Sequence, residues 1–146
     1  MIKNTFTSTI TLYNSYPDKS SGKSIIRFKR TVLKNCYFDK EIIKDIRSDR
    51  FSGEDSFICR IPENDAYTDD YQGEEGRFTL KPGDIIVEGE VFDEIEDMEG
   101  KRPSDLLKKY SGRSFSIEEV SKNTLLKGFP HYRASKVYRR REVKFR

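Results

Sequence analysis

Apolar and polar residues alternate along several stretches of this chain, which is the spacing of β-strands that bury one face. Residues 2–13 place their apolar side chains on one parity, with Thr and Ser between them. Residues 25–38 are rich in β-branched and aromatic side chains interrupted by Arg30 and Lys34, so we expect one long, bent strand. Turn-forming residues over 14–23 separate these two strands. The predicted buried face of the long strand consists of Ile26, Phe28, Val32, Cys36 and Phe38.

Four shorter strands are predicted further along the chain. Residues 56–61 alternate Phe, Cys and Ile on one face and end at Pro62. Residues 84–92 leave a tight Pro-Gly turn, and their pattern predicts a strand with Ile85, Val87 and Val91 on one side. The closing strands are expected at residues 114–120 and 131–138, joined through a turn at Lys122 and Asn123.

One helix and two long loops complete the predicted elements. Residues 103–110 begin with Pro, carry Lys in the last turn and are followed by Gly112, which predicts a short helix. Residues 64–76 are polar and acidic and predict a long exposed loop. Residues 39–54 are compatible with a short helix or an extension of the strand, and we interpret them as a loop. The expected fold is mainly β, a small β-barrel or sandwich of about six strands with one short helix late in the chain.

The composition fits one small domain with a thin core. The chain has 146 residues, of which 34% are hydrophobic and 36% charged, but it includes eight Tyr and ten Phe. We expect a single β-barrel domain over residues 1–138 and a basic C-terminal tail over residues 139–146. A thin core suits a small barrel, or a subunit that completes its burial against neighbours.

Location and cysteine chemistry are also constrained by the sequence. The first residues lack the apolar core of a secretory signal, and no apolar run approaches a membrane span, so we expect a soluble protein made in the cytoplasm. Cys36 and Cys59 stand alone, without the spacing of a disulfide framework or a four-ligand zinc site. Both are expected to be reduced core residues.

The net charge of +3 conceals two blocks of opposite sign. Residues 84–100 contain eight acidic residues and no Lys or Arg, whereas the end of the chain is basic. Unlike blocks favour charge-matched, head-to-tail packing between copies, and the alternative is two solvated surfaces. The candidate acidic docking face consists of Asp93, Glu94, Glu96 and Asp97, and the candidate docking residues of the tail are Arg139, Arg140, Arg141, Lys144 and Arg146.

The basic tail has three interpretations. Its mixture of aromatic and cationic residues is compatible with nucleic-acid binding. The alternation of Val143 and Phe145 is compatible with a strand that pairs with a neighbour. The tail can also dock on an acidic face such as residues 93–99. We favour docking over nucleic-acid binding.

The sequence offers no catalytic, cofactor or metal site. Gly22-Lys23-Ser24 resembles part of a phosphate-binding loop, but Pro17 occupies the position of its first glycine and a strand is predicted to follow. His131 is the only histidine and is expected to be half-buried and bonded to the backbone. Residues 93–97 lack the ligand spacing of a calcium loop. We therefore expect a non-enzymatic protein without metal or cofactor.

Several segments together resemble a family of phage proteins. These segments are residues 9–14, 28–38, 61–62, 78–90 and 130–132, in this order and with a short helix before the last. They are similar to small minor capsid or head-completion proteins of siphophages that infect Gram-positive bacteria. The similarity runs from about Thr9 to Val137, and the stretch LKPGDIIVEGE carries most of it. The chain departs from that pattern in having no Trp near Tyr37 or Phe38 and in its basic tail.

This resemblance implies a stopper-type head-to-tail connector with a β-barrel core. Such a protein would form a six- or twelve-fold homo-oligomeric ring between the portal or adaptor and the tail-terminator protein. Its loops would narrow the channel and help to retain packaged DNA. The resemblance implies no catalytic residue, no cofactor and no membrane partner. The protein would be found in the host cytoplasm during assembly and in the virion neck afterwards.

The acidic loop at residues 64–76 is the candidate channel or ring loop. Its carboxylates would repel phosphates and let DNA pass without sticking. The residues concerned are Asp65, Asp69, Asp70, Glu74 and Glu75. The alternative function is a small nucleic-acid-binding β-barrel that uses the basic C-terminal segment.

Overall fold

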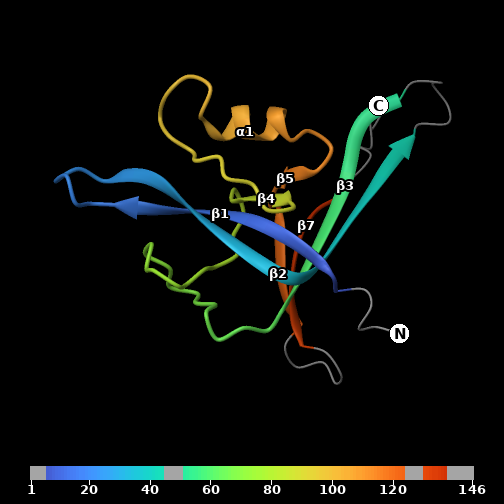
Figure 1. Cartoon of the computed structure of the whole chain (residues 1–146), viewed down its shortest axis with the longest axis horizontal. Helices are drawn as coiled ribbons and strands as arrows, with labels where there is room; N and C mark the ends of the chain where they lie inside the picture. Colours follow the sequence, from blue (N-terminus) through green and yellow to red (C-terminus); the bar gives the residue numbers. More distant parts are fainter. Residues whose placement is uncertain (1–5, 45–50, 124–129, 138–146) are drawn as a thin grey trace, which may run out of the picture.

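Seven antiparallel strands form a curled half-barrel that carries one short helix (Figure 1). The computed structural model describes residues 6–44, 51–123 and 130–137. The expected mainly β fold is confirmed. The strand order is β5-β4-β1-β2-β3-β7-β6. The elements are β1 (Ser8–Asp18), β2 (Ile25–Lys44), β3 (Phe51–Pro62), β4 (Ile85–Glu88), α1 (Pro103–Lys109), β5 (Ser114–Ser116), β6 (Glu119–Asn123) and β7 (His131–Lys136).

Strand β2 bends at a bulge and thereby belongs to both halves of the sheet. Its first part pairs with β1 and its second part, from Tyr37, pairs with β3. Between the pairs Ser8↔Cys36 and Ile10↔Leu33, β2 has one more residue than β1. Asn35 lies in this bulge with a φ of 60°, a left-handed conformation that Asn tolerates better than most residues. The predicted bend is confirmed.

The extra residue also reverses which side chains of β2 face inward. Before the bulge, the odd-numbered Leu33 lies in the core between the two halves, whereas Phe28 packs on the opposite face. After the bulge, the even-numbered Cys36 and Phe38 face that core. The prediction of a single buried face from Ile26 to Phe38 is therefore wrong, because a one-residue insertion exchanges the two faces of a strand.

The chain also changes sheet partner between β5 and β6. Ile117 donates its N–H to the carbonyl of Asp84 at 2.7 Å, and Glu118 donates to the carbonyl of Ser135 at 2.9 Å. The predicted strand at residues 114–120 is thus two strands, one on β4 and one on β7. This link connects the two ends of the strand order and curls the sheet.

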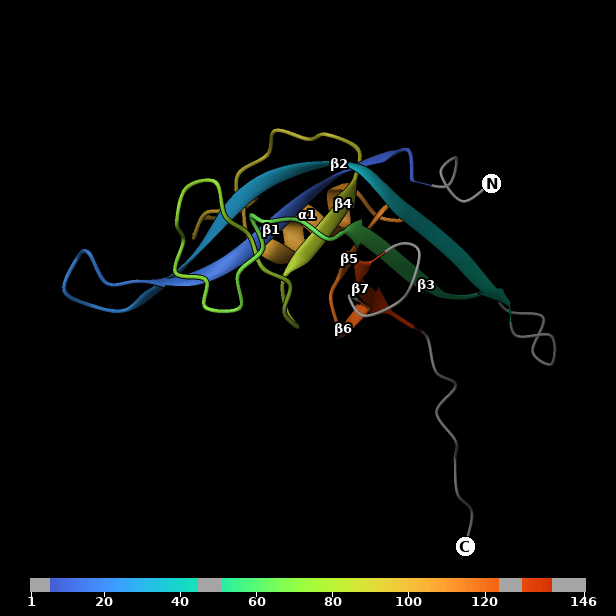
Figure 2. The ribbon, with the colours of Figure 1, turned by 90° about the horizontal axis from the view of Figure 1, so that it is seen from below.

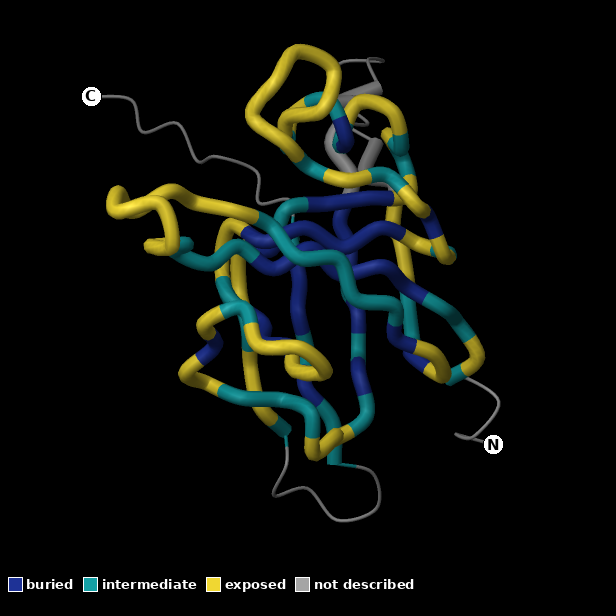
Figure 3. Tube along the Cα trace, turned by 60° about the vertical axis from the view of Figure 1, so that its left-hand side comes forward, coloured by how far each residue is buried: buried dark blue, intermediate teal, exposed yellow. Residues whose placement is uncertain are grey.

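The main core fills the space between the two halves. The rings of Phe57 and Phe115 stack at 5.2 Å across it, and Phe38 packs against both. Cys36 and Cys59 are free, have no exposed surface and lie in this core, as predicted. Burial raises the pKa of Cys36 to about 12, which leaves the thiol protonated and unreactive. Figure 3 shows the buried residues concentrated in the central strands, with exposed residues in the surrounding loops.

A second apolar cluster lies beneath α1. It consists of Tyr13, Ile85, Val87, Val91 and Leu106, so the predicted face of residues 85–91 is confirmed. The helix begins with Pro103, and Asp105 accepts from the N–H of Arg102 at 3.1 Å. Strand β4 ends earlier than predicted, at Glu88.

Three other predicted boundaries are wrong. The turn expected from residue 14 begins only after β1, which runs to Asp18 and pairs Pro17 with Ile26. Residues expected to form a loop after Phe38 extend β2 to Lys44, and β3 begins at Phe51. The expected turn at Lys122 and Asn123 lies within β6, where these residues pair with β7. In each case the next or preceding strand along the chain pairs with these residues and extends the hairpin further than the residue types alone indicate.

We predict that Asn35→Val destabilises the protein by about 1–2 kcal/mol, because a β-branched residue is strained at positive φ. Asn35→Gly is expected to be neutral or slightly stabilising, since glycine adopts this conformation freely. Lys34→Val, at the adjacent exposed position, is the matched control. Urea unfolding measures the stability of all three variants. Equal losses of stability for Asn35→Val and Asn35→Gly would contradict the role of the left-handed conformation at the bulge.

Candidate functional site

The candidate site is built around a two-stranded arm that projects from the sheet. Within β1, only residues Ile10 to Tyr13 pair with β4. Beyond Tyr13, β1 and the first residues of β2 continue as a hairpin that extends to one end of the molecule (Figure 1). An isolated two-stranded ribbon is marginally stable in water, so this arm needs support from other segments.

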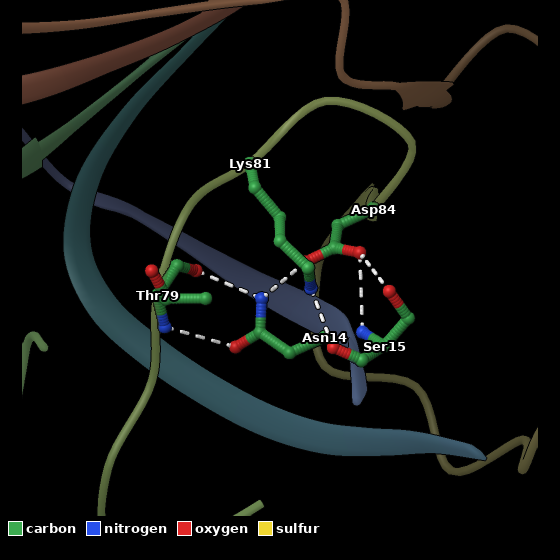
Figure 4. Close-up of polar contacts among 5 residues, drawn as sticks. All are labelled: Asn14, Ser15, Thr79, Lys81 and Asp84. Atoms are coloured by element: carbon green, nitrogen blue, oxygen red, sulfur yellow. Dashed lines mark hydrogen bonds and ion pairs between the residues drawn. The ribbon is translucent and has the colours of Figure 1, made fainter. Parts of the chain in front are cut away.

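Asp84 supplies the main support from inside the protein (Figure 4). Its carboxylate has no exposed surface and accepts from the backbone N–H and hydroxyl of Ser15 at 3.1 and 2.9 Å. It also accepts from Asn14 Nδ2 and Lys81 Nζ, both at 2.8 Å. Asn14 in turn bonds the backbone N–H and carbonyl of Thr79. We call these five residues the Asp84 cluster; it fixes the base of the arm to the start of β4 and to the preceding loop.

The segment between β3 and β4 braces the same face of the arm. The rings of Tyr16 and Tyr71 meet edge to face at 6.2 Å, and Lys29 pairs with Glu75 at 2.6 Å. Gly73 lies against the Tyr16 ring with a φ of 88°, and a Cβ there would come within 2.7 Å of ring carbons. Figures 1 and 2 show this segment, in green, beside the arm.

Residues 25–28 of the arm, which alternate between its two faces, form one wall of a groove. The other wall is the segment after β4 and the start of α1, which lies above the arm in Figure 1. The groove has a volume of about 750 Å³. Three of its apolar side chains are well exposed, namely Ile25 at 41%, Ile26 at 63% and Met98 at 48%. The half-buried Phe28 and Ile95 also line it.

Charged side chains surround these apolar residues. Glu94 lies 3.5 Å from Arg30, Glu96 lies 3.2 Å from Lys101, and Asp97 lies 3.7 Å from Arg102. Arg27 also lines the groove and pairs with Asp18 at 2.5 Å. All three acidic side chains are largely exposed, and exposed pairs of this kind contribute only about 0–1 kcal/mol each. Their carboxylates can therefore exchange partners at little cost.

Asp93 differs from the other residues of the predicted acidic docking face. Its carboxylate accepts from Lys109 Nζ at 2.6 Å and from the hydroxyl of Tyr110. These hydrogen bonds hold the pKa of Asp93 below its usual range. Asp93 thus anchors the segment after β4 to the end of α1, whereas Glu94, Glu96 and Asp97 line the groove.

The predicted acidic loop is partly folded against the rest of the protein. All five of its candidate carboxylates are exposed, but Asp69 pairs with Lys122 and Glu75 with Lys29. Tyr71 is buried, and Tyr67 stacks on Tyr132 at 4.2 Å. The prediction of an exposed loop is therefore wrong for Tyr71, although it is right for the five carboxylates. Asp65, Asp70 and Glu74 remain exposed carboxylates on its surface.

Other predicted sites fall outside this region or outside the described residues. The basic tail, with Arg139, Arg140, Arg141, Lys144 and Arg146, lies beyond the part of the chain that the structure describes. His131 is half-buried, with Nε2 3.2 Å from Nδ2 of Asn123. Within the described ranges, no group of three or more His, Cys, Asp or Glu side chains is placed to hold a metal ion. Nor do these ranges contain a helix long and apolar enough to cross a membrane.

The sequence patterns missed the groove and the Asp84 cluster. Asp84 was assigned to the acidic block, although its partners Asn14 and Ser15 come from the first strand. One local signal in the sequence was available for the groove. Ile25 and Ile26 are adjacent in a strand, so their side chains point to opposite faces. The end of a hairpin readily buries only one of these faces, which leaves an apolar side chain exposed.

A family model matches most of the chain, residues 5–135. The chain belongs to the DUF6751 family, a family of unknown function. No curated protein and no solved structure matches it. The matched range of the DUF6751 model includes the arm, the Asp84 cluster and both walls of the groove, and it ends before the basic tail.

For this DUF6751 protein, we predict that Asp84→Ala destabilises the fold by about 3–5 kcal/mol, because it leaves Lys81, Asn14 and Ser15 without their shared acceptor. Asp84→Asn is also expected to destabilise the fold. The asparagine NH2 group is a hydrogen-bond donor, and it would face the N–H and O–H donors that now bind the carboxylate of Asp84. Asp65→Ala, in an exposed loop, should change stability by less than about 0.5 kcal/mol. Urea unfolding distinguishes these outcomes, and equal stability of the Asp84 and Asp65 variants would disprove the role of the cluster.

Proposed function

We propose that this protein is a structural, non-enzymatic subunit of a tailed-phage neck, a stopper-type connector that acts as one copy in a ring. The ring would join the portal or adaptor to the tail and help to retain packaged DNA. The protein would be made in the host cytoplasm and reside in the virion neck.

The observation that carries this proposal is the groove beside the arm. A monomer leaves Ile25, Ile26 and Met98 substantially exposed within one region bounded by charged residues. Contiguous apolar surface rimmed by polar residues is typical of protein–protein interaction sites. The arm that presents it is braced on its other face by the Asp84 cluster, so the groove is held ready for a partner.

The shape of the subunit supports assembly with unlike surfaces in contact. The arm lies at one end of the long axis, and the hairpin of β2 and β3 extends toward the other (Figures 1 and 2). A head-to-tail interface joins two different patches of the same subunit and gives a ring when the rotation closes. In such a ring, Asp65, Asp70 and Glu74 would let the acidic loop face the DNA channel without binding phosphates.

We predict that the purified full-length protein forms closed rings of six or twelve copies as its concentration rises, and that Ile26→Glu weakens this assembly at least about tenfold. A charge in the groove opposes its burial against a neighbour. Phe92→Glu is the matched control, because Phe92 is 72% exposed but does not line the groove. Mass photometry and negative-stain electron microscopy measure the assembly of both variants. A protein that stays monomeric and binds no portal or tail protein would refute the proposal.

A second candidate function is nucleic-acid binding through the outer face of β3 and β7. Arg60 and Arg133 are opposite one another in the sheet, and the Arg60 guanidinium lies 5.1 Å from the centre of the Tyr37 ring. Their neighbours Cys59 and Ala134 face the core, so alternation places the arginines on the outside. Cations beside an aromatic ring suit contact with phosphates and bases.

This second function predicts binding to DNA that weakens steeply as salt rises. Arg60→Ser/Arg133→Ser should then reduce the slope of log affinity against log salt by about 2, since each phosphate contact contributes about one unit. The control is Lys19→Ser/Lys23→Ser at the tip of the arm, which removes the same charge elsewhere. Fluorescence anisotropy with a labelled duplex tests this, and equal slopes for the two double variants would exclude the Arg60 and Arg133 surface.

A further inference from the structure

We infer that the groove beside the arm receives the C-terminal segment of a second copy of this chain. Val143 and Phe145 would contact the apolar side chains of the groove, and the neighbouring cations would contact its acidic rim. This inference rests on the proposed function, in which copies of the chain assemble with one another, and the contact between tail and groove is the one that would join them.

The apolar part of the groove matches an extended segment in size and character. Ile26 and Met98 line the groove together with Phe28 and Ile95, and the first two are the more exposed. In an extended segment, residues two apart point to the same side, so Val143 and Phe145 form one apolar face. Burial of one valine and one phenylalanine suits a groove of about 750 Å³.

The charges are complementary. Residues 138–146 contain five cations, Arg139, Arg140, Arg141, Lys144 and Arg146, against the single acid Glu142. The groove carries Glu94, Glu96 and Asp97 along one wall. Each is held only by an exposed pair of at least 3.2 Å within its own subunit. Guanidinium groups of the tail form bidentate pairs with carboxylates and can replace these contacts.

The path of the chain favours a second copy over the same copy. Strand β7 begins at His131, which pairs with Pro62 of β3, and ends at Lys136, which pairs with Phe57 of β3. Phe57 in turn pairs with Lys40 of β2. Ile26 lies fourteen residues before Lys40, about 46 Å when measured along the bent strand at about 3.3 Å per residue. The nine residues from Lys136 to Phe145 span at most about 32 Å. Strand β7 therefore ends toward the end of the molecule remote from the arm, and the C-terminal segment begins there.

A tail from one end that binds a groove at the other end makes a head-to-tail contact. Each copy then has one occupied groove and one tail bound elsewhere, and the contact repeats from copy to copy. A closed ring satisfies every groove and every tail, as does a pair of subunits that exchange tails reciprocally, and the number of copies measured in solution distinguishes the two.

The test is a disulfide between two full-length variants, one carrying Met98→Cys and the other Phe145→Cys. Mixed at low concentration and then oxidised, they are expected to give a covalent heterodimer, resolved by a size tag on one partner. The native Cys36 and Cys59 have no exposed surface and do not compete. Phe92→Cys replaces Met98→Cys in the control, because Phe92 is more exposed but lies outside the groove lining.

Absence of the Met98–Phe145 link, or equal linking in the Phe92 control, would overturn the inference. A monomeric, internally linked product from one chain with both Met98→Cys and Phe145→Cys would also overturn it, because the tail would then occupy its own groove.

A second measurement separates this contact from the proposed function. The double variant Val143→Ser/Phe145→Ser is expected to weaken self-association at least about tenfold. The control is Tyr138→Ser, at the start of the tail, which is expected to leave self-association unchanged. If rings form equally well in the Val143 and Phe145 variant, the tail contact is wrong and the connector function stands. If the heterodimer forms but the protein neither closes into rings nor binds a neck partner, the tail contact stands and the connector function is wrong.

Discussion

The buried carboxylate of Asp84 is the interaction on which the rest of the structure depends. Four donors from Asn14, Ser15 and Lys81 converge on it, and Asn14 links it to the backbone of Thr79. A buried charge is tolerated only when its hydrogen-bonding capacity is satisfied in this way. Its partners come from β1 and from the loop before β4, so one residue at the start of β4 joins that loop to β1 just beyond the last pair of β1 with β4.

The Asp84 cluster determines which face of the arm is free. The segment before β4 is drawn against one face by the cluster and by Tyr71 and Glu75, so it cannot cover the other. The segment after β4 is fixed at the base of the arm, where Asp93 binds Lys109 and Tyr110 of the α1 end and its carbonyl accepts from the hydroxyl of Tyr13. The groove is the space left between two restrained segments, and its apolar side chains stay exposed because neither segment can collapse onto them.

Sequence patterns predicted the elements better than the contacts between them. The mainly β fold, the helix after Pro103 and the buried cysteines follow from local periodicity and residue type. The bend of β2 was expected, but the change of inward face at Asn35 was not, because a bulge is defined by the pairing of β2 with β1. The role of Asp84 depends on partners up to 70 residues away. Its carboxylate is indistinguishable in sequence from the surface acids that follow it, so no periodicity could have identified it.

The bulge at Asn35 also bears on the proposed assembly. It lies on β2 between the arm, which carries the groove, and the end of the sheet from which the C-terminal segment departs. The angle between the acceptor groove and the donor tail is therefore set by the bend of this one strand. In a head-to-tail assembly that angle decides whether successive copies close into a ring or continue as an open helix. In the proposed ring, the bend of β2 is thus the physical feature that would fix the number of copies, and the contact of the tail would provide the affinity between them.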